Sequence, residues 1–156
     1  KSLDSLAGFE TKKALSLSND GIVHGFREKF EKILSYGVDF VFGNRDEALA
    51  LTGTDNIDDA IEALKEKDFT TIITDGPNGS FIITEGNIIT NNGLEVEAID
   101  TNGAGDMFAG AFMHAMLSGK ELHECGAFAN LAASKIVQTF GPRLKKEEYK
   151  NLLENL

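Results

Sequence analysis

Residues 100–112 have the sequence DTNGAGDMFAGAF, and this stretch gives the clearest indication of how the chain folds. Apolar residues between positions 107 and 116 recur at helical spacing, which predicts a helix over residues 104–118 with one buried face. The Gly-Ala-Gly turn at 103–105 then lies at the helix N-terminus. Unpaired N–H groups and the positive end of the helix dipole meet there, so the turn is a candidate anion site.

Asp106, directly behind this turn, has two interpretations. It can simply complement the helix dipole, an interaction worth about 0.3–1 kcal/mol. Alternatively, it can accept a proton from a hydroxyl group while the neighbouring N–H groups hold a phosphoryl group, which is a coherent arrangement for phosphoryl transfer. The loop by itself leaves both interpretations open.

The rest of the chain alternates between strand and helix patterns. Strands are predicted at 14–19, 38–42 and 70–74, a β-hairpin at 81–84 and 87–90, and helices at 4–13, 24–35, 46–52, 58–65, 104–118, 121–139 and 145–154. This alternation predicts an α/β fold with a parallel sheet, helices on both of its faces and a β-hairpin at its edge. No linker or repeat divides the sequence, so we expect one domain over residues 1–156.

Composition narrows the class of function. The chain is 42% hydrophobic and 26% charged, which is typical of a globular domain. Its net charge of −10 argues against nucleic acid or a membrane surface as a partner. Cys125 is the single cysteine, so no internal disulfide can form, and a reducing, cytoplasmic compartment is expected. The oligomeric state stays open, a homodimer included.

Two common nucleotide-binding motifs are missing. There is no GxxxxGK[ST] sequence, and Phe108 occupies the third glycine place of a G-x-G-x-x-G motif starting at Gly103. An NAD-binding oxidoreductase domain is therefore disfavoured. The chain begins at Lys1 with a helix pattern that leads into a strand, and we expect it to be part of a longer protein.

Residues 100–113, DTNGAGDMFAGAFM, resemble the second signature of the ribokinase-like carbohydrate and nucleoside kinases, the PfkB family. NRDE (44–47) is similar to the family's N-x-x-E element, and TDGPNG (74–79) to its T-x-G-x-x-G nucleotide loop. FVFGNRDEALALTG (40–53) and FGPRL (140–144) are most similar to bacterial adenosine-kinase-like members. The resemblance implies a three-layer α/β/α ribokinase-like fold, of which this chain is the C-terminal half.

The resemblance also implies catalytic roles. Asp106 is the expected base that takes the proton of the acceptor hydroxyl. The backbone N–H groups of Gly103, Ala104 and Gly105 are the expected anion hole for the γ-phosphoryl group of ATP.

Metal sites are implied in the same way. Asn44 and Glu47 match the element that organises Mg²⁺, commonly through water, and Mg²⁺ needs only one or two carboxylates beside substrate phosphates. An Asn-x-x-Glu sequence after a strand is also a common helix cap with its capping-box partner. Asp100 and Asn102 align with a site for a monovalent cation such as K⁺ in some members.

Further residues are implied in nucleotide binding. Thr74, Gly76 and Gly79 correspond to the loop along the ATP phosphates and ribose, although TDGPNG alone indicates only a turn. Asn130 falls where members often place a polar residue beside the adenine. It lies among Ala and Leu residues, so hydrogen bonding within the helices is the alternative role.

The sequence thus favours the nucleotide-binding and catalytic part of an ATP- and Mg²⁺-dependent kinase acting on a hydroxyl of a sugar or nucleoside, adenosine being slightly favoured. A non-catalytic nucleotide-binding module is the main alternative, and an intact Asp106 argues against it. The expected partners are a small-molecule acceptor and the N-terminal half of the same enzyme. We expect little kinase turnover from this chain alone.

Overall fold

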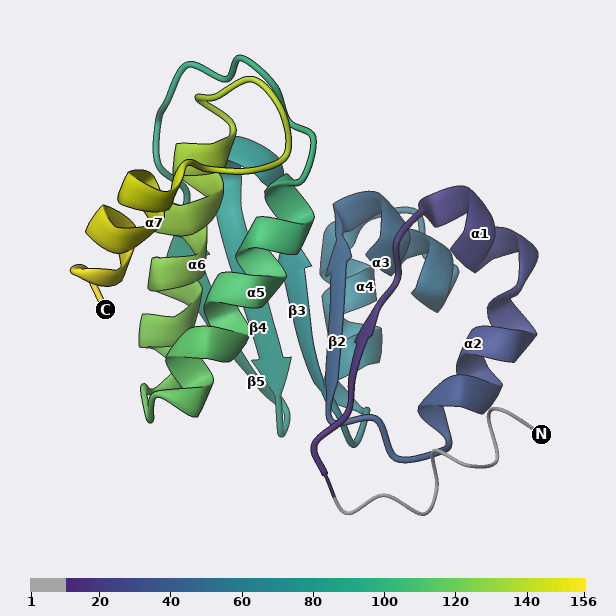
Figure 1. Ribbon diagram of the computed structural model, residues 1–156. Coiled ribbons are helices and arrows are strands. Elements are labelled where there is room, and N and C mark those ends of the chain that lie inside the picture. The colour runs from purple at the N-terminus through teal and green to yellow at the C-terminus, as the bar shows by residue number, and fades with distance from the viewer. Residues whose placement is uncertain (1–10) are drawn as a thin grey trace. The chain divides into compact units, whose positions relative to one another are not determined.

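The computed structural model describes residues 11–156, which divide into two compact units. The first unit extends to Ile73 and includes Ile82–Ile88, and the second contains Thr74–Phe81 and Ile89–Leu156 (Figure 1). The expectation of a single domain stays a prediction.

The regular elements follow one another in the order β1, α1, α2, β2, α3, α4, β3, η2, β4, β5, α5, α6 and α7. Their bounds are β1 Ala14–Ser16, α1 Asp20–Gly25, α2 Arg27–Leu34, β2 Phe40–Asn44, α3 Arg45–Thr52, α4 Ile57–Lys65, β3 Thr70–Thr74, the 3₁₀ turn η2 Gly76–Asn78, β4 Gly79–Thr84, β5 Asn87–Asn92, α5 Ala104–Leu117, α6 Leu122–Ile136 and α7 Lys146–Leu153.

The strands form one five-stranded sheet in the order β1-β2-β3-β4-β5. β1 pairs with β2 in parallel, Ala14 opposite Phe40. β3 and β4 are joined only by η2, a connection too short for the crossover that parallel strands need, so β4 runs antiparallel to β3. The α/β class and the hairpin β4–β5 at the sheet edge are confirmed, whereas the sheet is mixed rather than purely parallel.

Residues 93–98 form no regular element, and beyond them Ile99 and Asp100 donate their N–H groups to the carbonyl of Val137 (2.7 and 3.1 Å), the C-cap of α6. One predicted element is wrong. The single helix expected over 24–35 is two helices, α1 and α2, separated at Phe26.

The start of α1 explains part of this difference. The side chain of Asn19 accepts a hydrogen bond from the N–H of Ile22 (3.1 Å), so Asn-Asp-Gly begins a helix four residues earlier than expected. Most of the helix expected at 4–13 lies outside the described residues, and residues 11–13 are not helical.

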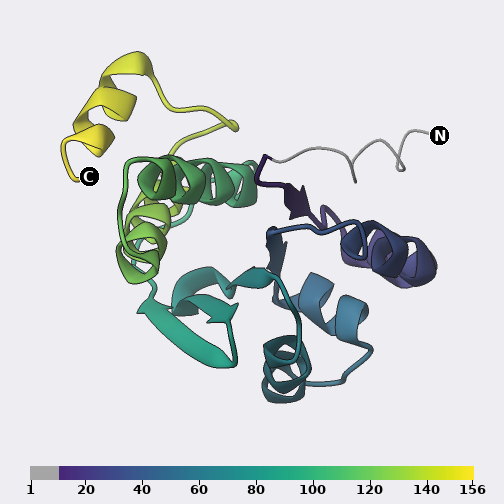
Figure 2. The same ribbon diagram turned by 90° about the horizontal axis from the view of Figure 1, so that it is seen from below.

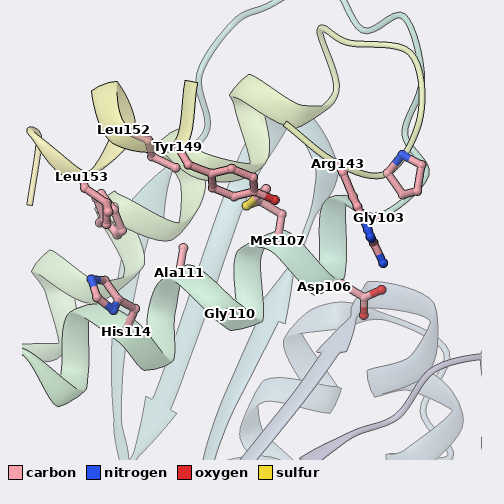
Figure 3. A pocket seen from close by; sticks show the side chains of 12 residues that line it. Gly103, Asp106, Met107, Gly110, Ala111, His114, Arg143, Tyr149, Leu152 and Leu153 are labelled. Atoms are coloured by element: carbon pink, nitrogen blue, oxygen red, sulfur yellow. The ribbon is translucent and has the colours of Figure 1, made fainter. Parts of the chain in front are cut away.

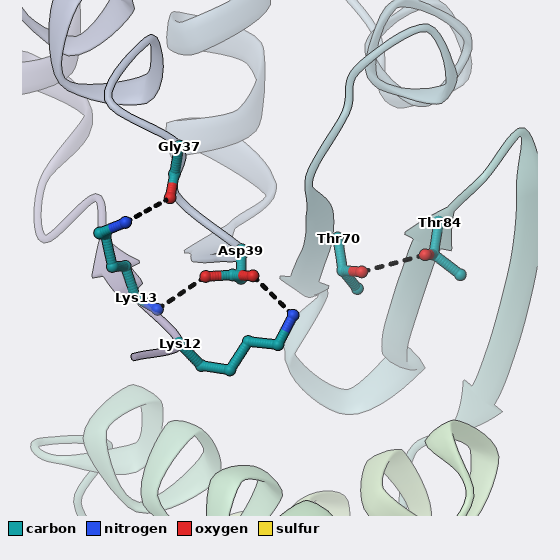
Figure 4. Close-up of polar contacts among 6 residues, drawn as sticks. All are labelled: Lys12, Lys13, Gly37, Asp39, Thr70 and Thr84. Atoms are coloured by element: carbon teal, nitrogen blue, oxygen red, sulfur yellow. Dashed lines mark hydrogen bonds and ion pairs between the residues drawn. The ribbon is translucent and has the colours of Figure 1, made fainter. Parts of the chain in front are cut away.

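In the first unit, Asp39 fixes the chain ahead of β1. Its carboxylate accepts hydrogen bonds from the backbone N–H of Lys13 (2.8 Å) and the ammonium group of Lys12 (2.7 Å), as Figure 4 shows. The Lys12 hydrogen bond, more than any other contact, lowers the pKa of Asp39. The hydroxyls of Thr70 and Thr84 are 3.0 Å apart and join β3 to β4 in the same unit.

The second unit is built around α5 and α6, which lie side by side in both views (Figures 1 and 2). Small residues such as Ala115 and Ala129 are fully buried and allow close approach of the helices. Phe108 and Phe112 on α5 stack with ring centres 6.3 Å apart, and both are buried. The apolar face predicted for residues 104–118 is thus buried as expected. Among residues 11–156, no helix has the length and apolar character needed to span a membrane.

Candidate functional site

The second unit contains a cavity of about 340 Å³ lined by several glycines, here called the glycine-rich cavity. A volume of this size is within the range of small-molecule sites. Its lining residues are Thr74, Gly76, Pro77, Gly79, Gly93, Leu94, Val96, Ala98, Thr101, Ala104, Gly105, Phe108, Asn130, Ala133, Ser134 and Val137. They come from the end of β3, the turn that follows it, the segment after β5, the start of α5, and α6 with its C-cap.

Backbone packing explains two of these glycines. A Cβ atom on Gly79, whose φ is +108°, would collide with the carbonyl oxygen of Asn91. A Cβ atom on Gly93 would collide with the carbonyl oxygen of Pro77. The turn after β3 and the end of β5 therefore cross backbone against backbone, and this crossing forms one wall of the cavity.

Gly76 and Gly105 have no such explanation from packing. A Cβ atom on either residue would meet no heavy atom within 4 Å, so the space beside each is open. Gly76 has a φ of +54°, which favours glycine in the turn, but Gly105 is an ordinary residue of the first turn of α5. The position of Gly105 thus leaves backbone accessible at a helix N-terminus, where N–H groups lack intrahelical acceptors.

The other residues of the Gly-Ala-Gly turn have structural roles. Gly103 is the N-cap of α5 in the left-handed region (φ +80°), and a Cβ there would lie 2.9 Å from Cβ of Pro142. The N–H of Ala104 donates to the carbonyl of Thr101 (3.2 Å). Among the three residues of the predicted anion hole, Gly105 is therefore the one for which the structure shows no such structural role.

Asp106 lies in the first turn of α5 and is exposed. It lines a second cavity of about 600 Å³, here called the Asp106 cavity. The remaining lining residues are Gly103, Met107, Gly110, Ala111, His114, Phe128, Pro142, Arg143, Tyr149, Leu152 and Leu153. Figure 3 shows the carboxylate of Asp106 and the guanidinium of Arg143 on the same side of the start of α5.

Asp100 and Asn102 line neither cavity. Asp100 accepts hydrogen bonds from the backbone N–H of Asn102 (3.0 Å) and of Gly141 (3.0 Å). These two bonds, the one from Asn102 first, lower the pKa of the Asp100 carboxyl. Asp100 therefore ties the segment before α5 to the loop after α6, and this role does not depend on a cation.

Asn44 and Glu47 belong to the first unit and form a capping box at the start of α3. The N–H of Glu47 donates to the side chain of Asn44 (2.9 Å), and the Asn44 backbone and amide nitrogens donate to the two Glu47 carboxylate oxygens (both 3.0 Å). Glu47 is only 7% exposed, and burial is the main reason its pKa is raised; Asp20 and Asp46 raise it further. The capping alternative is thus observed for this pair.

Besides capping α3, the carboxylate of Glu47 can act as an oxygen ligand for a cation. Each carboxylate oxygen accepts one hydrogen bond from Asn44, and an ionised carboxylate has about four acceptor positions. The neighbouring negative charges of Asp20 and Asp46 favour a cation near this carboxylate. Within residues 11–156, no three His, Cys, Asp or Glu side chains gather into a metal cluster. These residues fit a metal ion held through water and substrate better than one held by protein ligands alone.

The structure thus gathers Thr74, Gly76, Gly79, Ala104, Gly105 and Asn130 around one cavity, and Gly103 and Asp106 around another. No motif in the sequence indicates the apolar lining from residues 94–98 and from positions 133–137, or a role for Arg143. The Asn-Asn-Gly sequence at 91–93 is a turn signal that could have drawn attention to Gly93.

Comparison with known proteins identifies related kinases. The model of the pfkB family of carbohydrate kinases matches residues 6–148. A nucleoside kinase of Methanothermobacter thermautotrophicus is 36% identical over 104 residues, covering 66% of this chain and 33% of the relative. Adenosine kinase 2 of Arabidopsis thaliana is 30% identical over 142 residues, covering 81% of this chain and 41% of the relative. The chain thus spans less than half the length of these relatives.

Solved structures of kinases also resemble this chain. The adenosine kinase of Sinorhizobium meliloti superposes with a TM-score of 0.87 at 33% identity, covering 93% of this chain and 45% of that one. A probable sugar kinase of Rhizobium etli superposes with a TM-score of 0.89 at 30% identity, and the match covers 99% of this chain and 49% of that one. The ribokinase-like fold predicted from the three motifs is confirmed. The chain belongs to the pfkB family of carbohydrate kinases.

Proposed function

We propose that this chain is the nucleotide-binding and catalytic part of an ATP-dependent kinase that phosphorylates a hydroxyl group of a nucleoside or sugar. The main support is the glycine-rich cavity, whose lining includes six residues predicted for ATP and its γ-phosphoryl group, drawn from separate parts of the sequence. Family membership supports phosphoryl transfer as the reaction.

In this proposal the triphosphate lies along the turn after β3 and ends at the start of α5. Open space beside Gly76 and Gly105 leaves room for phosphate oxygens, and Gly105 lies in the first turn of α5, where the helix dipole favours an anion. The net charge of −10 makes such local groups necessary, because the protein as a whole repels an anionic ligand.

Asp106 acts as the base in the proposed reaction. The acceptor hydroxyl oxygen forms a bond to the γ-phosphorus, the bond from that phosphorus to the oxygen bridging to the β-phosphate breaks, and the hydroxyl proton passes to the carboxylate of Asp106. Transfer through a loose transition state requires mainly alignment of the hydroxyl, so an ordinary carboxylate suffices. Exposure of Asp106 at the rim of its cavity leaves it accessible to an acceptor.

Magnesium would neutralise phosphate charge when bound, and Asn44 and Glu47 are the residues we propose to hold its water ligands. Asp100 and Asn102 remain candidates for a monovalent cation such as K⁺. Because both oxygens of Asp100 already accept backbone hydrogen bonds, any such ion would add to an existing structural role.

The acceptor we favour is a nucleoside, and adenosine in particular. Relatives named adenosine kinase and nucleoside kinase match this chain at 27–36% identity. The proposed enzyme also needs an N-terminal half that contributes most of the acceptor site, since the chain spans less than half the length of these relatives.

A binding experiment on the 156-residue chain tests the nucleotide site. Thermal melts with MgATP should show stabilisation of about 2.7 kcal/mol at a ligand concentration 100 times the dissociation constant. NAD should give no shift, and a shift with NAD but none with MgATP would contradict the proposal. An ADP-release assay of the same chain with adenosine, ribose or fructose should show little turnover, and robust turnover would overturn the need for an N-terminal half.

A further inference from the structure

The start of α5 lies between the two cavities of the second unit. Ala104 and Gly105 line the glycine-rich cavity, whereas Gly103 and Asp106 line the Asp106 cavity. In the proposed reaction ATP occupies the first cavity, and the acceptor hydroxyl lies beside Asp106 in the second. The transferred phosphoryl group then moves past the helix start, from the side of one cavity to the side of the other.

Negative charge accumulates at this point of the reaction. The phosphates of ATP and the carboxylate of Asp106 both approach the acceptor hydroxyl, in a protein whose net charge is −10. Like charges repel each other more strongly where protein replaces water. The N–H groups at a helix start supply only about half a unit of positive charge. A positively charged side chain at the same place would offset the remaining repulsion.

Arg143 supplies a permanent positive charge beside the start of α5. Of the described residues that line the two cavities, it is the only Lys or Arg. His114 follows Asp106 by eight positions on α5, which is roughly 12 Å along the helix axis. Figure 3 shows the guanidinium of Arg143 on the same side of the helix start as the Asp106 carboxylate, with His114 farther along the helix.

The backbone is anchored on both sides of Arg143, while its side chain is free. Pro142 packs on Gly103, the N-cap of α5, and Leu144 is buried. The Arg143 side chain is exposed, and within residues 11–156 its guanidinium makes no hydrogen bond or ion pair. Five N–H donors are thus available near the helix start without a partner from this part of the chain.

We propose that Arg143 is a catalytic residue that donates hydrogen bonds to the oxygens of the phosphoryl group as this group passes from ATP to the acceptor. The inference rests on the proposed function. The guanidinium stays protonated throughout, so the bonds that form and break and the proton transfer to Asp106 are those given above. Its planar pair of N–H donors matches two phosphoryl oxygens. Because the phosphoryl group reaches the Asp106 cavity only during transfer, the contact stabilises the transition state rather than bound ATP.

Arg143→Ala should therefore lower kcat without weakening ATP binding. An arginine that stabilises a transferred phosphoryl group contributes about 10³–10⁵-fold to kcat in other phosphotransferases, and we expect a fall of about 10³-fold. The measurement uses the joined protein, which here means this chain together with its N-terminal half, and KM for MgATP should stay unchanged. Arg143→Lys keeps the charge but loses the planar fork, so it should retain only part of the activity.

Lys146→Ala is the matched control. It removes a positive charge three positions farther along the chain, at the first residue of α7, and Lys146 lines neither cavity. This variant should keep the turnover of the wild type. An equal loss of turnover in both variants would show that the overall charge of this region is responsible, and it would overturn the role of Arg143.

A transition-state analogue tests the contact without turnover. Adenosine and MgADP with aluminium fluoride imitate the phosphoryl group in transit, and Arg143→Ala should weaken this complex in the joined protein while leaving the affinity for MgADP alone unchanged. The same substitution should also weaken the complex when Asp106 is already replaced by Asn. If it has no effect in that background, Arg143 acts through Asp106 rather than on the phosphoryl group, and the inference is overturned.

Failure of this inference can be distinguished from failure of the proposed function. If the wild-type joined protein phosphorylates adenosine, ribose or fructose and Arg143→Ala lowers kcat by less than about tenfold, the kinase function stands and the inference is overturned. If the wild-type joined protein phosphorylates none of the three, the proposed function fails, and the inference fails with it.

Discussion

The backbone N–H of Gly141 donates to a carboxylate oxygen of Asp100 at 3.0 Å, across 41 positions of sequence. The other Asp100 oxygen accepts from the N–H of Asn102, so one side chain holds the loop before α5 against the loop after α6. Pro142, the next residue of that second loop, packs on Gly103 at the start of α5. The start of the proposed catalytic helix is therefore held in place by two contacts with the same distant loop.

Replacing Asp100 by Asn should destabilise the protein in a pH-dependent way. The two N–H groups lower the folded-state pKa of Asp100, so its contribution is complete above the unfolded pKa, about 3.9, and is lost as the pH falls through the folded value. Melting temperatures of both proteins from pH 2 to pH 7 should differ most near neutrality and converge in acid. A difference that stays constant with pH would show that the carboxylate charge is irrelevant to this contact.

Gly105→Ala should stabilise the fold and weaken MgATP binding. A Cβ there meets no heavy atom within 4 Å, so the substitution should stabilise α5 by up to about 1 kcal/mol. The added methyl group would occupy the space assigned to a phosphate oxygen and interrupt a charge-assisted hydrogen bond. Such a bond is worth about 1.5–3 kcal/mol, which corresponds to roughly 10–150-fold weaker MgATP binding.

Gly110→Ala is the control for this substitution. Gly110 lies in the same helix, also has open space where a Cβ would stand, and does not line the glycine-rich cavity. Chemical denaturation should show a similar gain in stability, and calorimetry should show unchanged MgATP affinity. Equal nucleotide binding by both variants would remove Gly105 from the proposed anion hole.

Asp106→Asn tests the proposed base. The substitution keeps the size of the side chain but removes its capacity to accept a proton, and loss of a general base costs about 10²–10⁴-fold in turnover. Turnover should be measured in the protein that joins this chain to its N-terminal half, whereas MgATP affinity can be measured in the 156-residue chain and should change little. If the variant keeps more than about a tenth of the activity, Asp106 serves the helix dipole rather than the reaction.

Glu47→Gln should affect magnesium more than folding. Burial and the charges of Asp20 and Asp46 raise the folded-state pKa of Glu47, so the wild type loses stability as the pH rises from the unfolded pKa through the folded one. The neutral variant lacks this loss, although its amide must rearrange against Asn44. Loss of a residue supporting a metal ion typically weakens metal affinity 10–100-fold, so the Mg²⁺ concentration that half-saturates ATP binding should rise correspondingly. An unchanged Mg²⁺ requirement would leave Glu47 as a helix cap alone.

The parts of this structure that local sequence decides were predicted well. β3 was predicted over the residues where it occurs, and α5 begins at Ala104 as expected, because a buried apolar run and a glycine turn before an apolar face are local signals. Residues 94–99 carry no local signal of their backbone partner, because Val137, which accepts the N–H of Ile99, lies far along the chain. The sequence did not predict the break at Phe26, because the spacing of the apolar residues around it is consistent with one helix or with two.

The candidate site likewise has parts that the sequence predicted and parts that it did not. Sequence motifs identified Thr74, Gly76 and Gly79 as neighbours, but the apolar walls of the cavity come from segments without any motif. Their placement depends on tertiary contacts such as those of Asn130 with the end of β5. The sequence of residues 44–47 is consistent with both a helix cap and a metal site. The hydrogen bonds between Asn44 and Glu47 show the cap, and the metal role stays a prediction.

The crossing of the turn after β3 over the end of β5 affects how an alignment of this family would be interpreted. Gly79 and Gly93 would remain glycine in any variant selected only for folding, because a side chain at either position collides with the opposing backbone. Their invariance across homologues would carry no information about nucleotides. Gly105 is under no such steric constraint, so an unchanging glycine there would record selection by a ligand.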